Sequence, residues 1–107
     1  MRAEDGAASG AIRVRVDADL EELMPRFMEN RRADIAAIES ALAARDFETI
    51  ATVAHGLKGS GGGYGFDAIT RIAIALERAA KARSRARAQQ SLDELARYLA
   101  RVEIVYE

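Results

Sequence analysis

His55 is the only histidine among the 107 residues, and the chain has no cysteine. An imidazole titrates near pH ~6.5, so a large share of it is neutral and nucleophilic at pH 7. Lys58 follows three residues later, which places its ammonium beside the imidazole on a helix. A phosphoryl group spreads its charge over several oxygens, and a neighbouring cation stabilises that charge. These two side chains are therefore suited to carrying a phosphoryl group on the ring.

Six of the eight glycines lie within residues 56–65, directly after the histidine. Gly59 and Gly62 occupy the positions above His55 on the same face if the helix continues that far. Without side chains, they would let another protein's surface approach the ring closely. Gly56 and Gly59 lie inside the apolar period, where each glycine costs about 1 kcal/mol relative to alanine. Helix termination explains these positions poorly, so the pattern favours close approach of a partner or ligand.

The elements that must position this site follow a helical period. Apolar side chains recur every three to four residues from Asp19 onward, as in amphipathic helices. Pro25 either opens the second helix or kinks a continuous one. The glycines at 61–63 leave open whether the third helix continues beyond Ser60. The expected helices are a short one with Leu20, Leu23 and Met24; a second with Phe27, Ile35, Ile38 and Leu42, ending near Arg45; a third capped by Asp46; a fourth from about Phe66 with Ile69, Ile72, Ala73, Leu76 and Ala80; and a last one capped by Ser84, with Leu92, Leu95, Ala96, Leu99, Val102 and Tyr106.

Four amphipathic helices joined by short connections bury their apolar stripes only by facing inward together. The sequence therefore predicts an all-α fold: an antiparallel up-down four-helix bundle with a short N-terminal helix across one end.

The N-terminal part of the chain has a different character. Residues 1–10 are small and polar and are expected to be disordered. Ile12–Val16 alternates in the manner of a strand, but no second strand is recognised, so we expect an extended segment that lies on the domain. Residues 1–16 are accordingly assigned to a flexible or extended N-terminal segment, and residues 17–107 to the helical domain.

A helical wheel places His55 outside the core. At ~100° per residue, the centre of the buried stripe of the third helix lies roughly 110° away from His55. A histidine in that position is either an idle surface residue or a functional one, and position alone favours neither. The neighbouring ammonium and the glycines favour a functional residue. The stripe consists of Phe47, Ile50, Ala51, Ala54 and Leu57.

Composition narrows the class of protein. The chain is 50% apolar and 31% charged, with a formal net charge of −1. This balance is typical of one globular domain without a global attraction to nucleic acid or to an anionic membrane. No apolar stretch approaches the ~20 residues of a membrane span, and no apolar segment of a secretory signal is found near the N-terminus. We therefore expect a cytoplasmic protein, and Met1 and the short tails favour a stand-alone chain.

Other motifs favour weaker alternatives. The glycine run does not match a phosphate-binding loop, because no Gly-Lys-Ser/Thr follows it and no strand precedes it. Ser60 and His55 lie on different helix faces, so nucleophilic hydrolysis is not expected, and too few carboxylates lie nearby for a metal site. A basic run most simply covers a solvated helix end, and a role in binding a partner or nucleic acid is the less favoured interpretation. Its members are Arg78, Lys81, Arg83, Arg85 and Arg87.

The residues around the histidine resemble the signature of the histidine-containing phosphotransfer (HPt) domain of bacterial phosphorelays. The resemblance is carried by Ala54-His55-x-Leu57-Lys58-Gly59, followed after five residues by Gly65. It covers roughly residue 17 to the C-terminus, and it implies the same helical bundle as the periodicity. Similar residues also occur at Phe27-Met28-Glu29, Asp46-Phe47 and Leu76-Glu77.

The resemblance implies that His55 accepts a phosphoryl group, that Lys58 is the cation beside it and that Gly59 permits docking of a receiver domain. Gly62 and Thr52 are expected to belong to the same docking surface. The phosphoryl group would come from a receiver-domain aspartate and pass to another one. The implied partners are receiver domains of response regulators and of a hybrid histidine kinase. Mg²⁺ would belong to the receivers, so that the chain is a phospho-carrier without a cofactor, metal or ATP site of its own.

Two other functions remain open. A non-transferring helical adaptor would bind a receiver or kinase domain through the same face. A nucleic-acid binder using the basic run ranks last. A monomer is expected in each case, because the inward stripes already satisfy one another.

Overall fold

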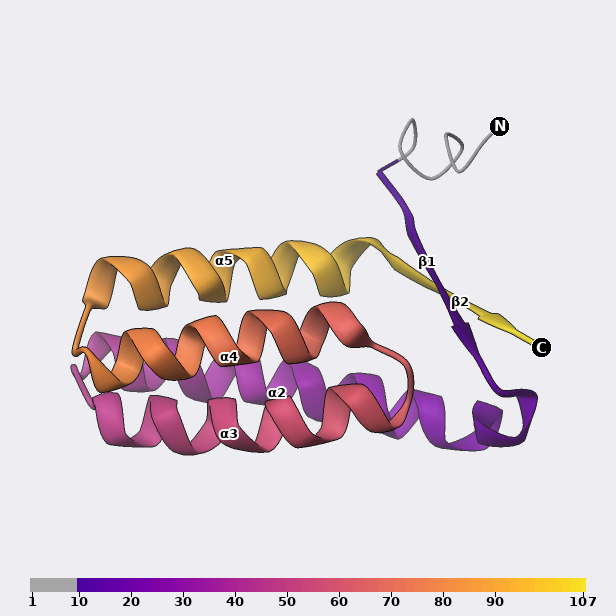
Figure 1. Ribbon diagram of the computed structural model, residues 1–107, viewed down its shortest axis with the longest axis horizontal. Helices are drawn as coiled ribbons and strands as arrows, with labels where there is room; N and C mark the ends of the chain where they lie inside the picture. The colour runs from indigo at the N-terminus through magenta and orange to yellow at the C-terminus, as the bar shows by residue number, and fades with distance from the viewer. Residues whose placement is uncertain (1–9) are drawn as a thin grey trace.

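The computed structural model of the chain describes residues 10–107. Four long α-helices and two short strands make up the fold (Figure 1). The predicted disorder of residues 1–10 lies outside the described residues, except at Gly10. In chain order the elements are β1 (Ile12–Val16), a 3-10 helix η1 (Ala18–Leu23), α2 (Met24–Ala43), α3 (Phe47–Gly63), α4 (Asp67–Lys81), α5 (Arg85–Arg101) and β2 (Val102–Tyr106).

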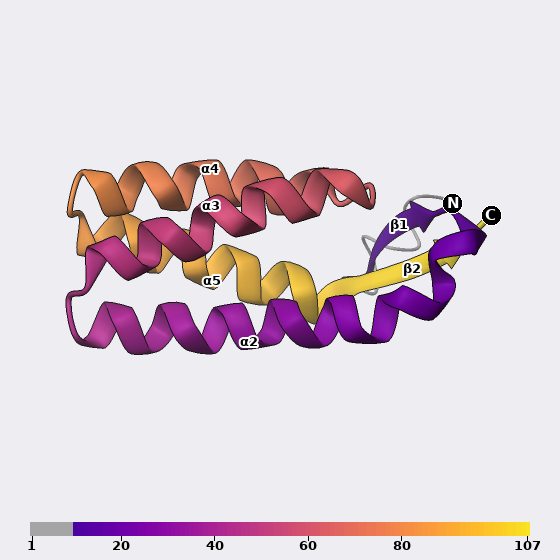
Figure 2. The ribbon, with the colours of Figure 1, turned by 90° about the horizontal axis from the view of Figure 1, so that it is seen from below.

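The four long helices surround one core. α2 packs on α3 and α5, and α4 packs on the same two helices, most extensively on α3. The α2–α3 and α4–α5 connections lie at one end of the bundle, and the α3–α4 connection lies at the other (Figures 1 and 2). The prediction of a mainly helical fold with four amphipathic helices is confirmed. Within residues 10–107, no helix has the length and apolarity needed to cross a bilayer.

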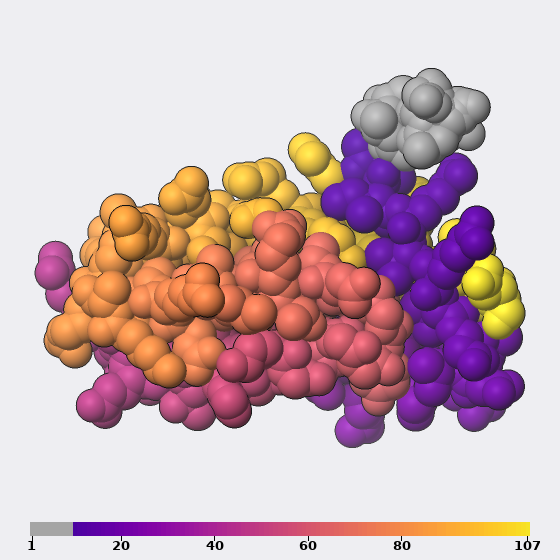
Figure 3. All heavy atoms as spheres, viewed as in Figure 1, coloured from indigo at the N-terminus to yellow at the C-terminus, as the bar shows by residue number. Residues whose placement is uncertain are grey.

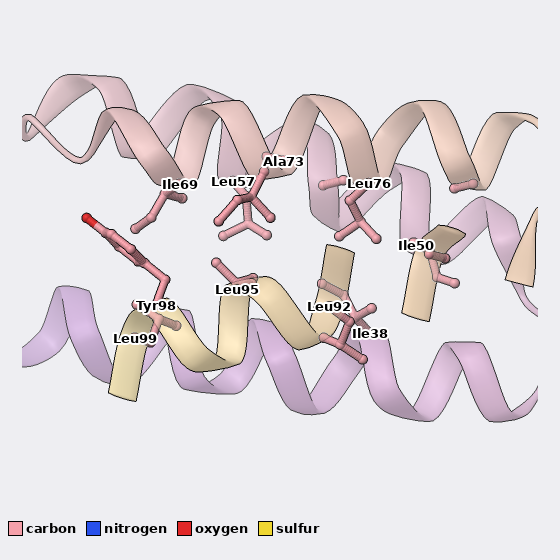
Figure 4. Close-up of a cluster of buried hydrophobic side chains, with 14 of the residues drawn as sticks. Ile38, Ile50, Leu57, Ile69, Ala73, Leu76, Leu92, Leu95, Tyr98 and Leu99 are labelled. Carbon is pink, nitrogen blue, oxygen red and sulfur yellow. The ribbon is translucent and has the colours of Figure 1, made fainter. Parts of the chain in front are cut away.

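The apolar side chains of the helices meet in the centre of the bundle (Figure 4). Ile50 and Leu57 of α3 are at most 1% exposed, and Leu76 of α4 is fully buried. Burial of one such side chain stabilises the fold by about 1.5–3 kcal/mol. The prediction for α5 is wrong at Ala96, which is exposed, because the core-facing position of that turn belongs to Tyr98. The buried stripe of α3 thus leaves the opposite side of this helix free for a site.

The helix caps agree with the sequence prediction. The Asp46 carboxylate accepts hydrogen bonds from the Thr49 backbone N–H (3.1 Å) and hydroxyl (2.6 Å) at the start of α3. These hydrogen bonds, that of the hydroxyl first, hold the pKa of Asp46 below its usual value. Ser84 accepts a hydrogen bond from the Arg87 N–H (3.3 Å) and caps α5. The starts of α3 and α5 are therefore set by local side chains.

The ends of α2 and α4 are also alike. Arg45 and Arg83 follow these helices with φ of 57° and 54°, in the left-handed region where glycine is commonest. The next residues, Asp46 and Ser84, donate their backbone N–H to carbonyls in the last turn of the preceding helix (2.8 and 2.9 Å). One residue thus closes a helix with its N–H and opens the next with its side chain, which accounts for connections without glycine or proline.

The pairing of the two strands corrects the sequence prediction. β1 pairs with β2 in parallel, from Ile12↔Val102 to Val16↔Tyr106, so the expectation of an unpartnered extended segment is wrong. The expectation that the last helix continues to Tyr106 is wrong for the same reason, since α5 ends at Arg101. Val102 and Tyr106 are four residues apart, a spacing that puts both on one face of a helix and equally on one face of a strand. The apolar pattern alone did not distinguish these structures.

The segment before α2 contains a second difference from the prediction. Of the residues expected in a short first helix, Leu20 and Leu23 lie in the 3-10 helix η1, whereas Met24 begins α2. Asp17 caps η1, and its carboxylate accepts the Asp19 N–H (2.8 Å). Pro25 lies in the first turn of α2, where its missing N–H costs nothing, so it opens this helix.

Candidate functional site

His55 lies on the exposed side of α3. Its side chain is 70% exposed, as expected from its position opposite the stripe of Ile50, Ala54 and Leu57. The ring is therefore reachable by a large partner.

A carboxylate from the neighbouring helix lies beside the ring. Glu77 of α4 approaches His55 Nδ1 with Oε2 at 3.5 Å, and its side chain is only 14% exposed. A carboxylate in this place favours a proton on Nδ1 and leaves the lone pair on Nε2. Glu77 thus contacts the ring on its Nδ1 side.

Two ammonium groups share the same carboxylate. Lys58 Nζ lies 3.2 Å from Glu77 Oε1, and Lys81 Nζ lies 3.5 Å from Oε2. The hydrogen bond from Lys58 is the main reason why the pKa of Glu77 is below its usual value, and the charges of both lysines act in the same direction against partial desolvation. The site therefore combines one imidazole, one ionised carboxylate and two cations.

The predicted pair of His55 and Lys58 meets through Glu77. Lys58 is half-buried and forms an ion pair with the Glu77 carboxylate, whereas most of the His55 ring is exposed to solvent. Glu77 was not predicted as a site residue, although the resemblance included it, and Lys81 was assigned only to the basic run. The four-residue spacing of Glu77 and Lys81 indicates in the sequence that both lie on one face of their helix. Only the packing of α4 on α3 shows that this face lies next to the histidine.

The glycines after the histidine fall into two groups. α3 continues to Gly63, so the glycines do not end it at Ser60. A Cβ atom at Gly56, Gly59 or Gly63 would meet nothing within 4 Å, and these residues leave the exposed face of the helix bare. This face is open at the position predicted for docking.

Gly62 and Gly61 are placed against α4 instead. A Cβ at Gly62 would lie 3.6 Å from the Thr70 hydroxyl, and one at Gly61 would lie only 3.0 Å from Ile69 and from Thr70. The Thr70 hydroxyl in turn donates a hydrogen bond to the Lys58 carbonyl (3.3 Å). Gly61, which sequence reasoning did not single out, allows the close approach of the two helices that carry the site.

The structure also shows the surroundings of Thr52 and Gly65, which the sequence analysis had named. The Thr52 hydroxyl, on the exposed part of α3 one turn before the histidine, donates to the Glu48 carbonyl (3.0 Å). Gly65 has φ of 90°, and a Cβ there would lie 3.4 Å from the Arg15 carbonyl, so glycine is needed for the turn between α3 and α4. Gly65 therefore acts on the fold of the site and not on its chemistry.

The comparison with known families identifies the class of this protein. The family model of the Hpt domain matches residues 22–104, which include every residue of the cluster around His55. The chain belongs to the Hpt domain family, as the resemblance predicted. Hpt domains carry out histidine-containing phosphotransfer in phosphorelays and interact there with receiver domains. Neither the curated proteins nor the solved structures that were compared gave a match.

Proposed function

We propose that His55 is the phosphoacceptor of a phosphorelay, loaded by an aspartyl phosphate of one receiver domain and unloaded by an aspartate of another. The observation that carries the proposal is the exposed ring with a carboxylate 3.5 Å from Nδ1. An imidazole held in this way presents Nε2 to an incoming phosphoryl group.

The transfer step follows from this orientation. Nε2 attacks phosphorus, a P–N bond forms, and the P–O bond to the aspartate breaks with its electron pair returning to the carboxylate. The ring then carries a positive charge with the proton still on Nδ1, and Glu77 lies where it stabilises that charge. The reverse step regenerates the neutral ring.

The two lysines are assigned to the phosphoryl charge. Lys58 is the main charge partner, and its Nζ is 3.2 Å from Glu77 before transfer. When the phosphoryl group arrives, the more highly charged anion competes with Glu77 for this ammonium. We assign the Mg²⁺ ion of the reaction to the receiver domain, and we expect this chain to act as a carrier without an ATP site.

The docking surface is assigned to the exposed face of α3. Gly59 lies beside the ring and offers no side chain against a partner, with Thr52 and Gly62 at its borders. The partners we propose are receiver domains of response regulators and of a hybrid histidine kinase, met by a monomer in the cytoplasm. We also propose that the bundle is antiparallel and up-down with η1 as its short N-terminal helix, a description supported by connections at alternating ends.

The test is phosphotransfer from an isotope-labelled receiver domain in the presence of Mg²⁺. Wild type is expected to take up label that is lost in acid, since phosphohistidine is acid-labile. His55→Gln is expected to take up none, while Glu39→Gln, an exposed change on α2, is expected to behave as wild type. Equal labelling of wild type and His55→Gln would contradict the assignment.

A non-transferring adaptor is the second candidate. It is favoured by the bare glycine face of α3, which allows close docking whether or not the ring reacts. An adaptor would bind the receiver with the same affinity after His55→Ala and would carry no label. Loss of label with unchanged receiver binding in the variant, together with transfer by wild type, would instead support the phosphorelay.

A further inference from the structure

A groove with a volume of about 400 Å³ runs between α4 and α5. Small side chains, Ala75 and Ala79 of α4, leave the room for it, and Arg78 and Arg87 line it. α4 and α5 lie side by side on the face seen in Figure 3. The groove is on the α5 side of α4, whereas Glu77 faces α3. It is therefore separate from the site around the histidine.

The charges along this groove are not balanced. α4 and α5 run in opposite directions from their connection (Figure 1), and Arg71 of α4 pairs with Glu94 of α5 at 3.0 Å. Arg78 lies about two turns after Arg71 in α4, and Arg87 lies about two turns before Glu94 in α5. The pairing of Arg71 with Glu94 therefore implies that Arg78 and Arg87, which both line the groove, lie opposite each other near the α4–α5 connection. Within residues 10–107 neither guanidinium has an ion-pair or hydrogen-bond partner. Two facing cations with no anion repel one another.

A buried hydroxyl in the groove also lacks a partner. Ser91 of α5 lines the groove and is only 8% exposed. Its hydroxyl makes no hydrogen bond to any part of the chain that the structure describes. Burial of a hydroxyl is unfavourable unless a hydrogen bond replaces its contact with water. A ligand in the groove would provide that hydrogen bond.

We propose that this groove binds a phosphate-bearing small molecule between Arg78 and Arg87. Guanidinium groups bind phosphate oxygens through paired N–H donors, and the Ser91 hydroxyl and the Gln90 amide supply further donors. The volume is within the range of small-molecule sites. The Glu94 carboxylate at the other end is already neutralised by Arg71. No aromatic side chain lines the groove, so recognition rests on the phosphate and not on a stacked base.

The test is titration of the whole chain with inorganic phosphate and with pyrophosphate, followed by NMR. Sodium chloride at matched ionic strength is the reference. We expect saturable shifts of the Arg78 and Arg87 side-chain N–H signals and of the Ser91 amide with the phosphates alone. Arg78→Gln and Arg87→Gln are each expected to weaken binding about tenfold, the loss typical of one charge-assisted hydrogen-bonding group.

The matched control is Arg85→Gln, which changes an exposed arginine in the same turn of α5 that does not line the groove. It is expected to retain wild-type binding. Without phosphate, Arg87→Gln is expected to melt no lower than wild type, because it removes a repulsion, so lost binding is distinguished from lost folding.

Three results would overturn the proposal. They are shifts that chloride reproduces, wild-type binding by both Arg78→Gln and Arg87→Gln, and binding of an acidic peptide with no response to either phosphate. The last result would instead make the groove a docking surface for protein. None of these results depends on whether His55 accepts a phosphoryl group.

Discussion

Glu77 is the residue that joins the chemistry of the candidate site to the fold. One oxygen binds Lys58, and the other lies near both His55 Nδ1 and Lys81. Its side chain is only 14% exposed, whereas those of His55 and Lys81 are each 70% exposed, so solvent screens these two contacts. Glu77 therefore contacts the ring and also links α4 to α3 through its ion pair with Lys58.

The stabilising contribution of Glu77 is expected to depend on pH. The lysines lower the pKa of Glu77 in the folded protein, so its contribution is complete above the usual carboxyl pKa of 4.5 and is lost as the pH falls through the lowered folded-state value. Melting temperatures of wild type and Glu77→Gln are expected to differ most at neutral pH and to converge in acid.

The control for this prediction is again Glu39→Gln, which removes an exposed carboxylate with no ion pair among residues 10–107. It is expected to change stability by less than about 0.5 kcal/mol. A difference between wild type and Glu77→Gln that is constant down to pH 2 would show that the carboxylate charge is not involved.

At the scale of elements, the contact between α3 and α4 determines the site. A Cβ at Gly61 would lie 3.0 Å from Ile69 and Thr70, closer than an ordinary van der Waals contact, whereas the place of a side chain at Gly59 is open. Both glycines lie in the same helix and have the same low helix propensity. They form a matched pair in which only the packing differs.

Gly59→Ala and Gly61→Ala are therefore expected to change stability in opposite directions. Gly59→Ala gains helix propensity of about 1 kcal/mol, which raises the melting temperature by ~4 °C or more. Gly61→Ala forces its methyl group against the Ile69 Cβ, which is attached directly to the backbone of α4, and such overpacking typically costs about 1–3 kcal/mol. Thermal melts of the two variants check the prediction, and a stabilised Gly61→Ala would contradict the packing argument.

At the scale of the molecule, the two ends of the described chain are tied together. β1 and β2 pair in parallel, and the chain between them contains all the helices. Val16, at the end of β1, is 1% exposed and belongs to the hydrophobic core. The two-stranded sheet thus extends the core beyond one end of the bundle.

Removal of β2 by ending the chain at Arg101 is expected to release β1. The unpartnered strand loses its ladder, and exposure of Val16 costs about 2 kcal/mol. Hydrogen exchange of the β1 amides is expected to become fast and the melting temperature to fall. Glu103→Gln, which breaks only an exposed ion pair with Arg13 at 3.9 Å, is expected to cost less than about 1 kcal/mol. Unchanged protection of β1 in the shortened chain would contradict the pairing.

Much of the fold and part of the candidate site were predictable from the sequence. The side chains of Asp46 and Ser84 accept hydrogen bonds from backbone N–H groups of the helices that they begin. The His55 side chain points away from the core because of the apolar period of its own helix. Such interactions span a few residues, so they are visible in the local pattern. The Hpt family followed from a motif of the same local kind.

The tertiary structure alone decided which distant residues meet. Glu77 reaches His55 because α4 packs on α3 in one particular register, and that register depends on the space left at Gly61. Val102–Tyr106 becomes a strand because β1 is there to pair with it, although its apolar spacing fits a helix equally well. Contacts of this kind depend on the free energy of packing whole elements against one another. That free energy involves residues far apart in the chain, so it cannot be predicted from a short segment of the sequence.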